Sequence, residues 1–516
     1  MARAKGEGSR MGLIASIRTA RNLRVFRRLE RSVAEAKDLA RQVELAKIAT
    51  AFARQSGCGC FGSPTIDGAF LERAKGIRAK LSDRHVPGTV LMVLSEAYFW
   101  GGHTRAVERW IEADRSRRYS VVVTRQGKDA EFPARLRTAV VKSGGTVEVM
   151  SGEDGPETRA ARLREVSSAF EFVVLHVHPD DPLPILAYGT PEFRRPVGLY
   201  DHLDYSFWLG ASVADGVGEL RTWGADLSRE RRGLENLTVL GIPGDAPGLV
   251  LPDRTAARGR LGLPPDAKVV MTTGAVYKYR PMPERDFLGL ATALLKASPK
   301  SLVVGIGMTF EDFPAWKAAS DRFGGRLRAL GKLPHDKFMD ALAAADVVVD
   351  SWPIPGFTAL ADAVQCGCPV LTCPTPGGLM DWMRGSSAEC ATPSELVRRV
   401  REILDDPSAG TALLEDVVPR LEASRAPAEF VRRVEAFYAG LAGGHSVRAF
   451  EPRFGASREF DDFLSHMEMF DFKTAASWWC RDLYGKWSWM AVSFDSERHP
   501  WKAPLLWLRW ALKGCR

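Results

Sequence analysis

Residues 346–372, which read DVVVDSWPIPGFTALADAVQCGCPVLT, limit the fold more than any other stretch. The β-branched run Val347–Val349 ends at Asp350, as a buried parallel strand would. A loop with two prolines and one glycine follows, and a helical segment, 359–365, then ends at Gly367. Another β-branched strand begins directly after that glycine. The order strand, loop, helix, strand predicts a parallel α/β sheet.

Ligands of such sheets bind beyond the carboxyl ends of the strands, beside helix N-termini that favour phosphate. We therefore expect Asp350, Gly356, Thr358 and Asp362 to face a phosphorylated ligand. The Thr358 hydroxyl is also expected to cap the helix that follows it.

The chain of 516 residues is too long for one hydrophobic core, so two or three domains are expected. Strands alternate with helical stretches in two series, which predicts two doubly wound sheets with a cleft between them. The predicted segments are a basic helical N-terminal arm (1–86), an N-terminal α/β domain (87–242), a C-terminal α/β domain (243–449) and a Trp-rich extension (450–516). The expected class is therefore α/β.

Positive charge is concentrated in the arm. Residues 1–54 hold 13 Lys/Arg against 5 Asp/Glu, whereas the whole chain has a net charge of +8, so the rest of the chain is neutral. An apolar stripe runs through Leu29, Val33, Ala36, Ala40 and Val43. This pattern favours a helix packed on the body or on another subunit, with contact to anionic lipid or nucleic acid as the alternative. We expect no nucleic-acid partner.

The opposite end of the chain is rich in tryptophan. Seven of the 14 tryptophans lie between residues 478 and 510, and 501–513 contains no acidic residue. A closing helix packed on the body and an interfacial helix at a membrane surface are both open. No apolar run reaches transmembrane length, so we expect a cytoplasmic protein, with peripheral membrane attachment as the alternative. The Cys-Gly-Cys pairs at Cys58 and Cys366 predict buried thiols rather than zinc ligands.

Polar residues follow several strands of the first series. Gly101, Gly102 and His103 come directly after the first strand and open a helix, where backbone N–H groups are free to meet a ligand. His103 is a candidate general base, and capping of the turn is the alternative. His178 and His202 follow later strands, where contact with an acceptor hydroxyl is favoured over metal binding. No metal is expected.

In the second series, Lys278 follows the first strand and is placed to neutralise a diphosphate without a metal. A solvated lysine is the alternative. His335 follows the third strand, where nucleotide contact and helix capping are both open.

These motifs resemble the nucleotide-sugar half of the GT-B glycosyltransferases, closest to the O-GlcNAc-transferase-like group. The stretch 276–281 resembles that group's lysine loop, His335 its histidine, and 350–370 its aspartate-proline-glycine-threonine loop. The resemblance implies two Rossmann-like domains. It also implies that Lys278 holds the diphosphate of the donor.

By the same resemblance, Thr358 and nearby N–H groups would bind phosphate and Asp362 the ribose hydroxyls. Phe357 departs from the pattern, because the group usually has histidine there, and Ala359 stands where a second threonine is common. The Glu-x7-Glu signature of retaining GT-B enzymes is absent, which favours inversion.

The expected activity is that of a glycosyltransferase of the hexosyltransferase type, acting in polysaccharide or glycoconjugate biosynthesis. The donor would be a nucleoside diphosphate sugar, UDP-linked, with no other cofactor. The acceptor would be a hydroxyl of a glycan, a lipid-linked glycan or a protein. His103 is the first candidate base, with His178 or His202 in reserve. A nucleotide-sugar 2-epimerase and a non-catalytic scaffold of the same fold are the alternatives.

Overall fold

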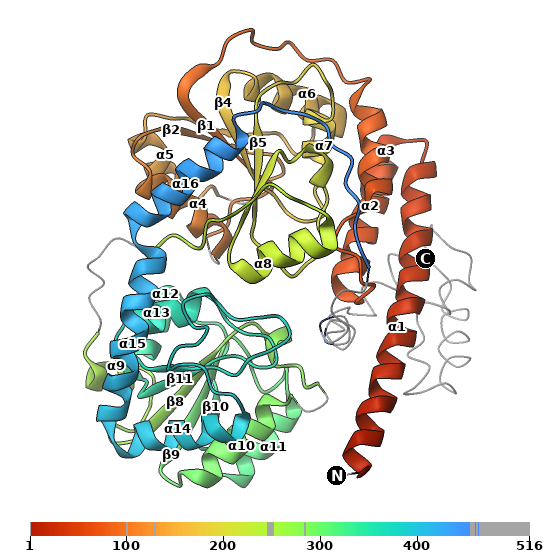
Figure 1. Cartoon of the computed structure of the whole chain (residues 1–516). Coiled ribbons are helices and arrows are strands. Elements are labelled where there is room, and N and C mark those ends of the chain that lie inside the picture. The colour runs from red at the N-terminus through yellow and green to blue at the C-terminus, as the bar shows by residue number, and fades with distance from the viewer. Residues whose placement is uncertain are drawn as a thin grey trace.

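The computed structural model shows two α/β domains, one above the other in Figure 1, with three N-terminal helices beside the upper one. It describes residues 2–99, 102–127, 131–244, 252–282, 285–454, 460 and 463, with side chains from residue 19 onward except at 335 and 336. The predicted Trp-rich extension lies outside the described residues from 464 to the end. Among the described helices, none is both long and apolar enough to cross a membrane.

The N-terminal domain is built on a seven-stranded sheet in the order β3-β2-β1-β4-β5-β6-β7. Every pairing in it is parallel. The strands are β1 (Val86–Leu94), β2 (Arg118–Val123), β3 (Val147–Val149), β4 (Phe170–His176), β5 (Val197–Asp201), β6 (Gly216–Glu219) and β7 (Leu237–Val239). Leu94 at the end of β1 pairs with His176 at the end of β4, so polar residues after these strands meet at one edge.

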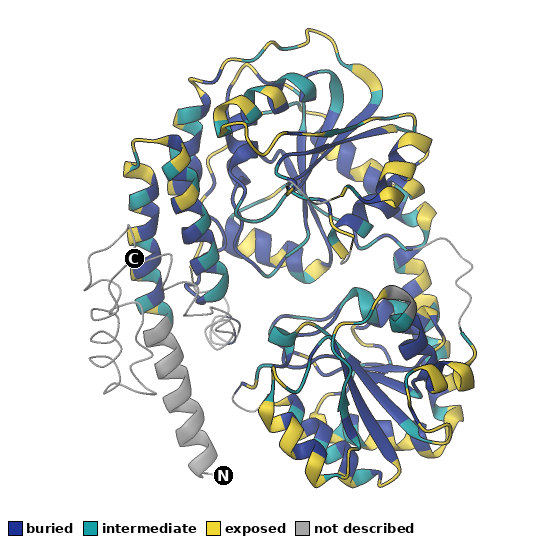
Figure 2. Cartoon of the chain, turned by 180° about the vertical axis from the view of Figure 1, so that it is seen from behind, coloured by how far each residue is buried: buried dark blue, intermediate teal, exposed yellow. Residues whose placement is uncertain are grey.

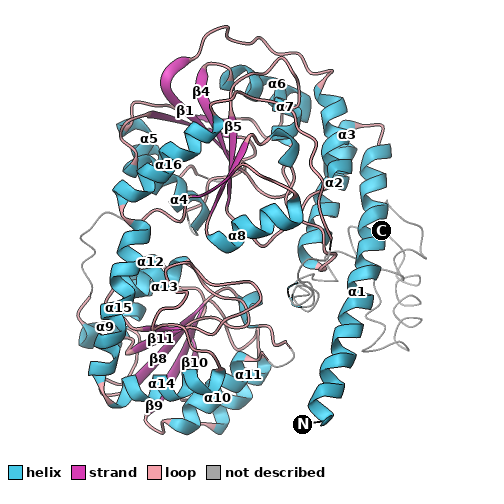
Figure 3. Cartoon of the chain, viewed as in Figure 1, coloured by secondary structure: helices cyan, strands magenta, loops and turns pink. Residues whose placement is uncertain are grey.

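Helices cover both faces of this sheet (Figure 3). They are α4 (Gly102–Ala113), α5 (Ala134–Lys142), α6 (Pro156–Ser167), α7 (Leu183–Tyr188) and α8 (Thr222–Leu227), with short turns η1 (Ala211–Val213) and η2 (Ser228–Arg232). The strand β6 was not predicted, because its sequence, Gly-Val-Gly-Glu, has low β-propensity.

The C-terminal domain has a five-stranded parallel sheet in the order β10-β9-β8-β11-β12. Its strands are β8 (Lys268–Thr273), β9 (Ser301–Ile306), β10 (Leu327–Ala329), β11 (Val347–Val349) and β12 (Val370–Leu371). Its helices are α9 (Arg254–Arg260), η3 (Val276–Tyr279), α10 (Phe287–Ala297), α11 (Pro314–Arg322), α12 (His335–Ala344), α13 (Thr358–Gln365), α14 (Pro393–Asp405) and α15 (Pro407–Arg425). The prediction of two doubly wound sheets is confirmed.

The last described helix, α16 (Pro427–Leu441), returns to the N-terminal domain. Its Phe430 and Tyr438 pack against Trp110 of α4 and Phe172 of β4. A Cβ at Gly198 of β5 would lie 2.4 Å from the Phe437 ring, so the close approach of this helix requires glycine there. The sequence predicts that the chain up to residue 449 belongs to the C-terminal domain. In the structure, however, the segment 427–454 packs on the N-terminal domain.

The N-terminal helices α1 (Ala2–Glu35), α2 (Leu39–Gln55) and α3 (Pro64–Ala74) are packed on the N-terminal domain. Figure 2 shows their inner faces buried, and Phe26, Ile66 and Phe70 share one apolar cluster with strand residues of the sheet. The apolar stripe predicts a single helix, but its residues are divided between the two helices α1 and α2. The chain turns at 36–38, and Asp38 begins α2 by accepting the backbone N–H of Arg41 at 2.7 Å.

Candidate active site

A cavity of about 420 Å³ lies between the two domains. The N-terminal domain forms most of its wall, from the ends of β1, β4 and β5, and the C-terminal domain contributes Phe357 and Thr358. The two domains approach closely here, since a Cβ at Gly102 would lie 3.5 Å from the Thr358 hydroxyl. The cavity thus lies at the carboxyl ends of the strands, where doubly wound sheets bind ligands. Its polar side chains are Arg54, Tyr98, His103, His178, Asp180, Asp201, His202 and Thr358.

His103 lines this cavity with one ring nitrogen unbonded. Its Nε2 lies 2.8 Å from the backbone carbonyl oxygen of His176, which can only accept, so we assign the ring hydrogen to Nε2. The other nitrogen, Nδ1, is buried and has no hydrogen-bond partner among the described residues. Burial, with a smaller contribution from His178, lowers the pKa of His103 to about 4. His103 is therefore neutral at pH 7, with the lone pair on its buried Nδ1 unbonded.

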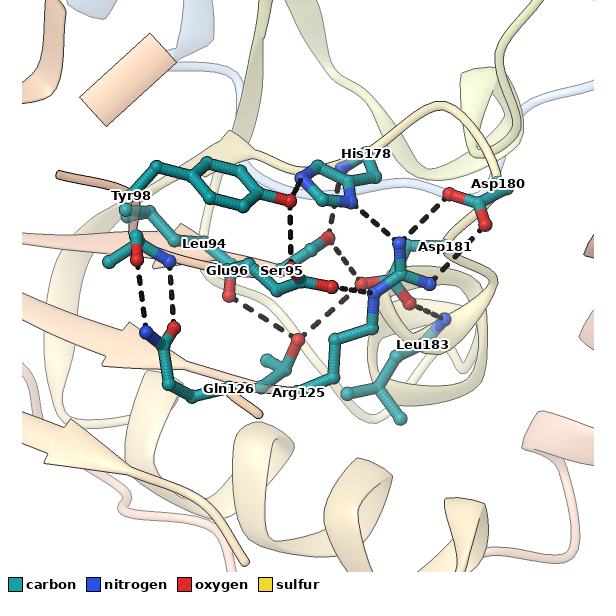
Figure 4. A network of polar contacts seen from close by, with 12 residues as sticks. Leu94, Ser95, Glu96, Tyr98, Arg125, Gln126, His178, Asp180, Asp181 and Leu183 are labelled. Carbon is teal, nitrogen blue, oxygen red and sulfur yellow. Dashed lines mark hydrogen bonds and ion pairs between the residues drawn. The ribbon is translucent and has the colours of Figure 1, made fainter. Parts of the chain in front are cut away.

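His178 belongs to a hydrogen-bonded network instead, in which both of its ring nitrogens have partners (Figure 4). Arg125 donates to its Nδ1 at 2.6 Å, so the hydrogen lies on Nε2, 3.1 Å from the Tyr98 hydroxyl. That hydroxyl donates to Glu96 at 2.7 Å, and Arg125 also bonds Asp180 at 3.0 Å. Because Arg125 occupies its only lone pair, His178 is poorly placed to take a proton from a substrate.

His202 is the second histidine of the cavity with a free lone pair. The buried His176 directs Nε2 at the Met92 sulfur at 3.2 Å, which places its hydrogen there. Its Nδ1 then accepts from Nε2 of His202 at 3.0 Å, and Nδ1 of His202 is left with a lone pair. Burial lowers the pKa of both rings well below the usual value. The His103 and His202 rings lie 4.2 Å apart, so the pair stays neutral at pH 7.

In the C-terminal domain, Asp350 shapes the loop before α13. Its carboxylate accepts the Gly356 N–H at 2.6 Å and the Thr372 hydroxyl at 2.8 Å. A Cβ at Gly356 would lie 3.0 Å from that carboxylate, so glycine is required for the contact. Burial raises the pKa of Asp350 to about 7. The sequence predicts that Asp350 faces a ligand, whereas in the structure one of its oxygens bonds Gly356 of the loop and the other bonds Thr372, just after β12.

The ring of Phe357 receives a cation from each domain. Nζ of Lys278, on η3, lies 5.4 Å from the ring centre and donates to the Pro355 carbonyl at 2.8 Å. The Arg221 guanidinium, from the N-terminal domain, lies 4.4 Å from the same ring centre. Arg221 is fully buried and bonds both oxygens of Asp204, at 2.6 and 3.1 Å. A phenyl face attracts cations, so phenylalanine at this position links the two domains.

The helix α13 begins at Thr358, and Phe357 is its N-cap residue without a side-chain cap bond. The prediction that Thr358 caps this helix is therefore wrong, because Thr358 is already its first residue. One turn on, Asp362 lies 4.0 Å from Arg109 of α4 and 3.8 Å from Arg425 of α15. His335 begins α12, but its side chain lies outside the described residues, as does Gly101.

Sequence reasoning missed several residues of the site. Arg54 reaches the cavity from α2, and nothing in the sequence links that helix to the strand ends. Arg125 and Arg221 were missed as well, because an arginine after a strand is common and its partners are distant in the chain.

Two doubly wound parallel sheets facing each other across a cavity define the GT-B fold, which this chain has. TarM aligns over 68% of this chain and 99% of its own, with 8% identity and a TM-score of 0.53. Alr3699/HepE of Anabaena, in complex with UDP and glucose, aligns over 68% of this chain and 100% of its own, with 16% identity and a TM-score of 0.52. The resemblance to GT-B glycosyltransferases is thus confirmed for the fold.

One curated relative shares sequence, D-inositol 3-phosphate glycosyltransferase 1 of Catenulispora acidiphila. It is 30% identical over 177 residues, which are 31% of this chain and 41% of the relative, so the match spans less than half of either. An O-GlcNAc transferase from Thermobaculum terrenum aligns over 83% of both chains with 15% identity and a TM-score of 0.49. No family model matches the chain.

Proposed function

We propose that this protein is a metal-independent glycosyltransferase that moves a hexose from a UDP-linked donor to a hydroxyl acceptor with inversion. The observation that carries the proposal is His103. It is a neutral histidine with an unbonded nitrogen, in a cavity between the domains of a GT-B fold. The UDP and glucose bound to HepE and the name of the curated relative support a nucleotide-sugar donor.

Each domain has a separate part in this reaction. Lys278 and the first turn of α13, which begins at Thr358, would stabilise the departing diphosphate, since cations and helix N-termini favour negative charge. Asp362 would bind the ribose hydroxyls of the donor. His335 is a further proposed nucleotide contact, at the start of α12.

His103 would act as the general base. As its Nδ1 takes the proton of the acceptor hydroxyl, the oxygen attacks the anomeric carbon from the face opposite the diphosphate. The bond to the acceptor oxygen forms while the bond to the diphosphate oxygen breaks, which inverts the anomeric centre. His202 is the base in reserve, because its Nδ1 also has a lone pair, whereas the only lone pair of His178 is occupied.

Two measurements on the full chain test the proposal. Titration calorimetry with UDP should show binding, and mass spectrometry should detect sugar transfer from a panel of UDP-sugars to hydroxyl acceptors. Conversion of the donor without any acceptor would instead indicate a 2-epimerase. The absence of UDP binding would leave the non-catalytic scaffold.

A further inference from the structure

The charged groups of the cavity wall are unevenly paired. Asp180 is bonded to Arg125, which holds the pKa of that carboxyl below its usual value although burial opposes the shift. Asp201 accepts from the Trp208 indole at 2.9 Å and lies 3.5 Å from Arg232. The carboxylates of the wall are therefore neutralised within the protein, and its histidines are uncharged.

Arg54 is the exception on this wall. Its Nε donates to the Ser206 hydroxyl at 3.2 Å. Among the described residues its guanidinium forms no salt bridge, although its charge, after that of Arg125, helps to lower the pKa of Asp180. The side chain is half-buried and lines the cavity. An arginine that lines a cavity without a bonded carboxylate has donors available for an anion, so this position is best explained by an anionic group that a substrate brings.

The backbone around Arg54 is held firmly. Its neighbours Phe52 and Ala53 are buried in the apolar cluster that joins the N-terminal helices to the sheet. The same helix is tied to α1 by Gln42, whose amide donates to the Val33 carbonyl at 2.9 Å. A guanidinium carried on a fixed helix is pre-oriented for a planar or tetrahedral anion, which lowers the entropic cost of binding.

The position of Arg54 distinguishes it from the donor site. Lys278 and the first turn of α13, which would hold the donor diphosphate, belong to the C-terminal domain. Arg54 belongs to the N-terminal helices, and its bonded partner, Ser206, belongs to the N-terminal domain. Because the proposed function assigns the donor diphosphate to the C-terminal domain, a group bound by Arg54 would belong to the acceptor.

We propose that the acceptor carries an anionic group, a phosphate or a carboxylate, beside its reacting hydroxyl, and that Arg54 binds this group. The inference rests on the proposed function and deepens it, because it names the chemical class of the acceptor. It also gives the N-terminal helices a part in acceptor selection.

Matched acceptors test this. The full chain is assayed with a UDP-sugar that it uses as donor and with three pairs of acceptors. The pairs are glycerol with glycerol 3-phosphate, glucose with glucose 6-phosphate, and glucose with glucuronate. We expect kcat/KM at least about tenfold higher for the charged member of a pair, as one charge-assisted contact would give. The phosphate and glucuronate pairs distinguish the two anions. An equal or reversed preference, or transfer to none of these acceptors, would overturn the proposal.

Variants then connect the preference to Arg54. In Arg54→Gln the ratio of charged to neutral kcat/KM should fall about tenfold to a hundredfold, mainly through KM, and Arg54→Lys should restore part of it. Arg28→Gln, an exposed arginine of α1, is the control and should keep the wild-type ratio. A ratio unchanged in Arg54→Gln would refute the assignment. If the proposed function itself is wrong, the wild type will neither bind UDP nor transfer sugar to any acceptor, which distinguishes that outcome from a wrong role for Arg54.

Discussion

The two domains build their shares of the cavity in opposite ways. The C-terminal domain contributes a short contiguous stretch around α13, supported by one lysine from η3. The N-terminal domain assembles its share from α2, the β1–α4 connection and the ends of β4 and β5. The contrast shows that a binding loop can be encoded locally. The hydrogen bonding of a histidine such as His103 instead depends on contacts between residues far apart in the chain.

The part of the cavity built by the N-terminal domain should determine the rate of sugar transfer. The variant His103→Ala tests this most strongly. Loss of a general base typically lowers the rate about 10²–10⁴-fold, so transfer should fall by that factor while UDP still binds. The measurements are kcat with a saturating donor and calorimetry with UDP. His85→Ala is the control, since that histidine contacts Arg195 away from the cavity. Normal transfer by His103→Ala would move the base to His202.

The buried ion pair that holds Arg221 against the Phe357 ring should contribute strongly to stability. Asp204→Ala leaves the buried Arg221 without its counter-charge, which typically costs about 3–5 kcal/mol. The free energy of unfolding, measured with urea, should fall by that amount. The matched control is Asp226→Ala, whose partner Arg229 is exposed, and its effect should stay below about 1 kcal/mol. Equal losses in the two variants would show that burial of the pair is unimportant.

The part of the cavity built by the C-terminal domain should determine the affinity for the donor rather than the rate of transfer. Lys278→Ala removes a cation beside the first turn of α13, and the loss of one charged hydrogen bond is worth about 1.5–3 kcal/mol. UDP affinity should therefore fall roughly tenfold to a hundredfold by calorimetry. Lys296→Ala, an exposed lysine of α10, should bind UDP as the wild type does. Unchanged affinity in Lys278→Ala would remove Lys278 from the donor site.

The smallest effect concerns the loop itself and its response to pH. The pKa of Asp350 is raised from 3.8 to about 7 by burial, so the folded state holds its proton more tightly than the unfolded state does. The resulting stability is complete below pH 4 and is lost as pH rises toward 7. The Asp350→Asn variant cannot titrate at this position, so its stability does not fall in this way as the pH rises. Its Tm relative to the wild type should rise by about 2 °C or more between pH 5 and pH 8, whereas a constant difference would contradict the shift.

Much of the fold was accessible from sequence because hydrophobic periodicity is a local property. The run Val347–Val349 predicted a strand, and the glycine at 367 predicted the end of a helix. The structure has both features at these places. The strand β6 was missed because its glycines are selected by tertiary contact: a Cβ at Gly218 would lie 2.3 Å from Leu240. The return of α16 was missed because its apolar face fits either domain equally well by pattern.

The sequence by itself determined the α/β class, the loop before α13 and the presence of polar residues at the strand ends, because each follows from neighbours along the chain. Only the tertiary structure decided which histidine is free to accept a proton. His103 and His178 have the same chemistry, and they differ because one lone pair is unbonded while the other is taken by Arg125. The tertiary structure also decided that Arg54 enters the cavity, since the packing of α2 places it there. Protonation and charge pairing depend on distances in space, which spacing in sequence does not contain.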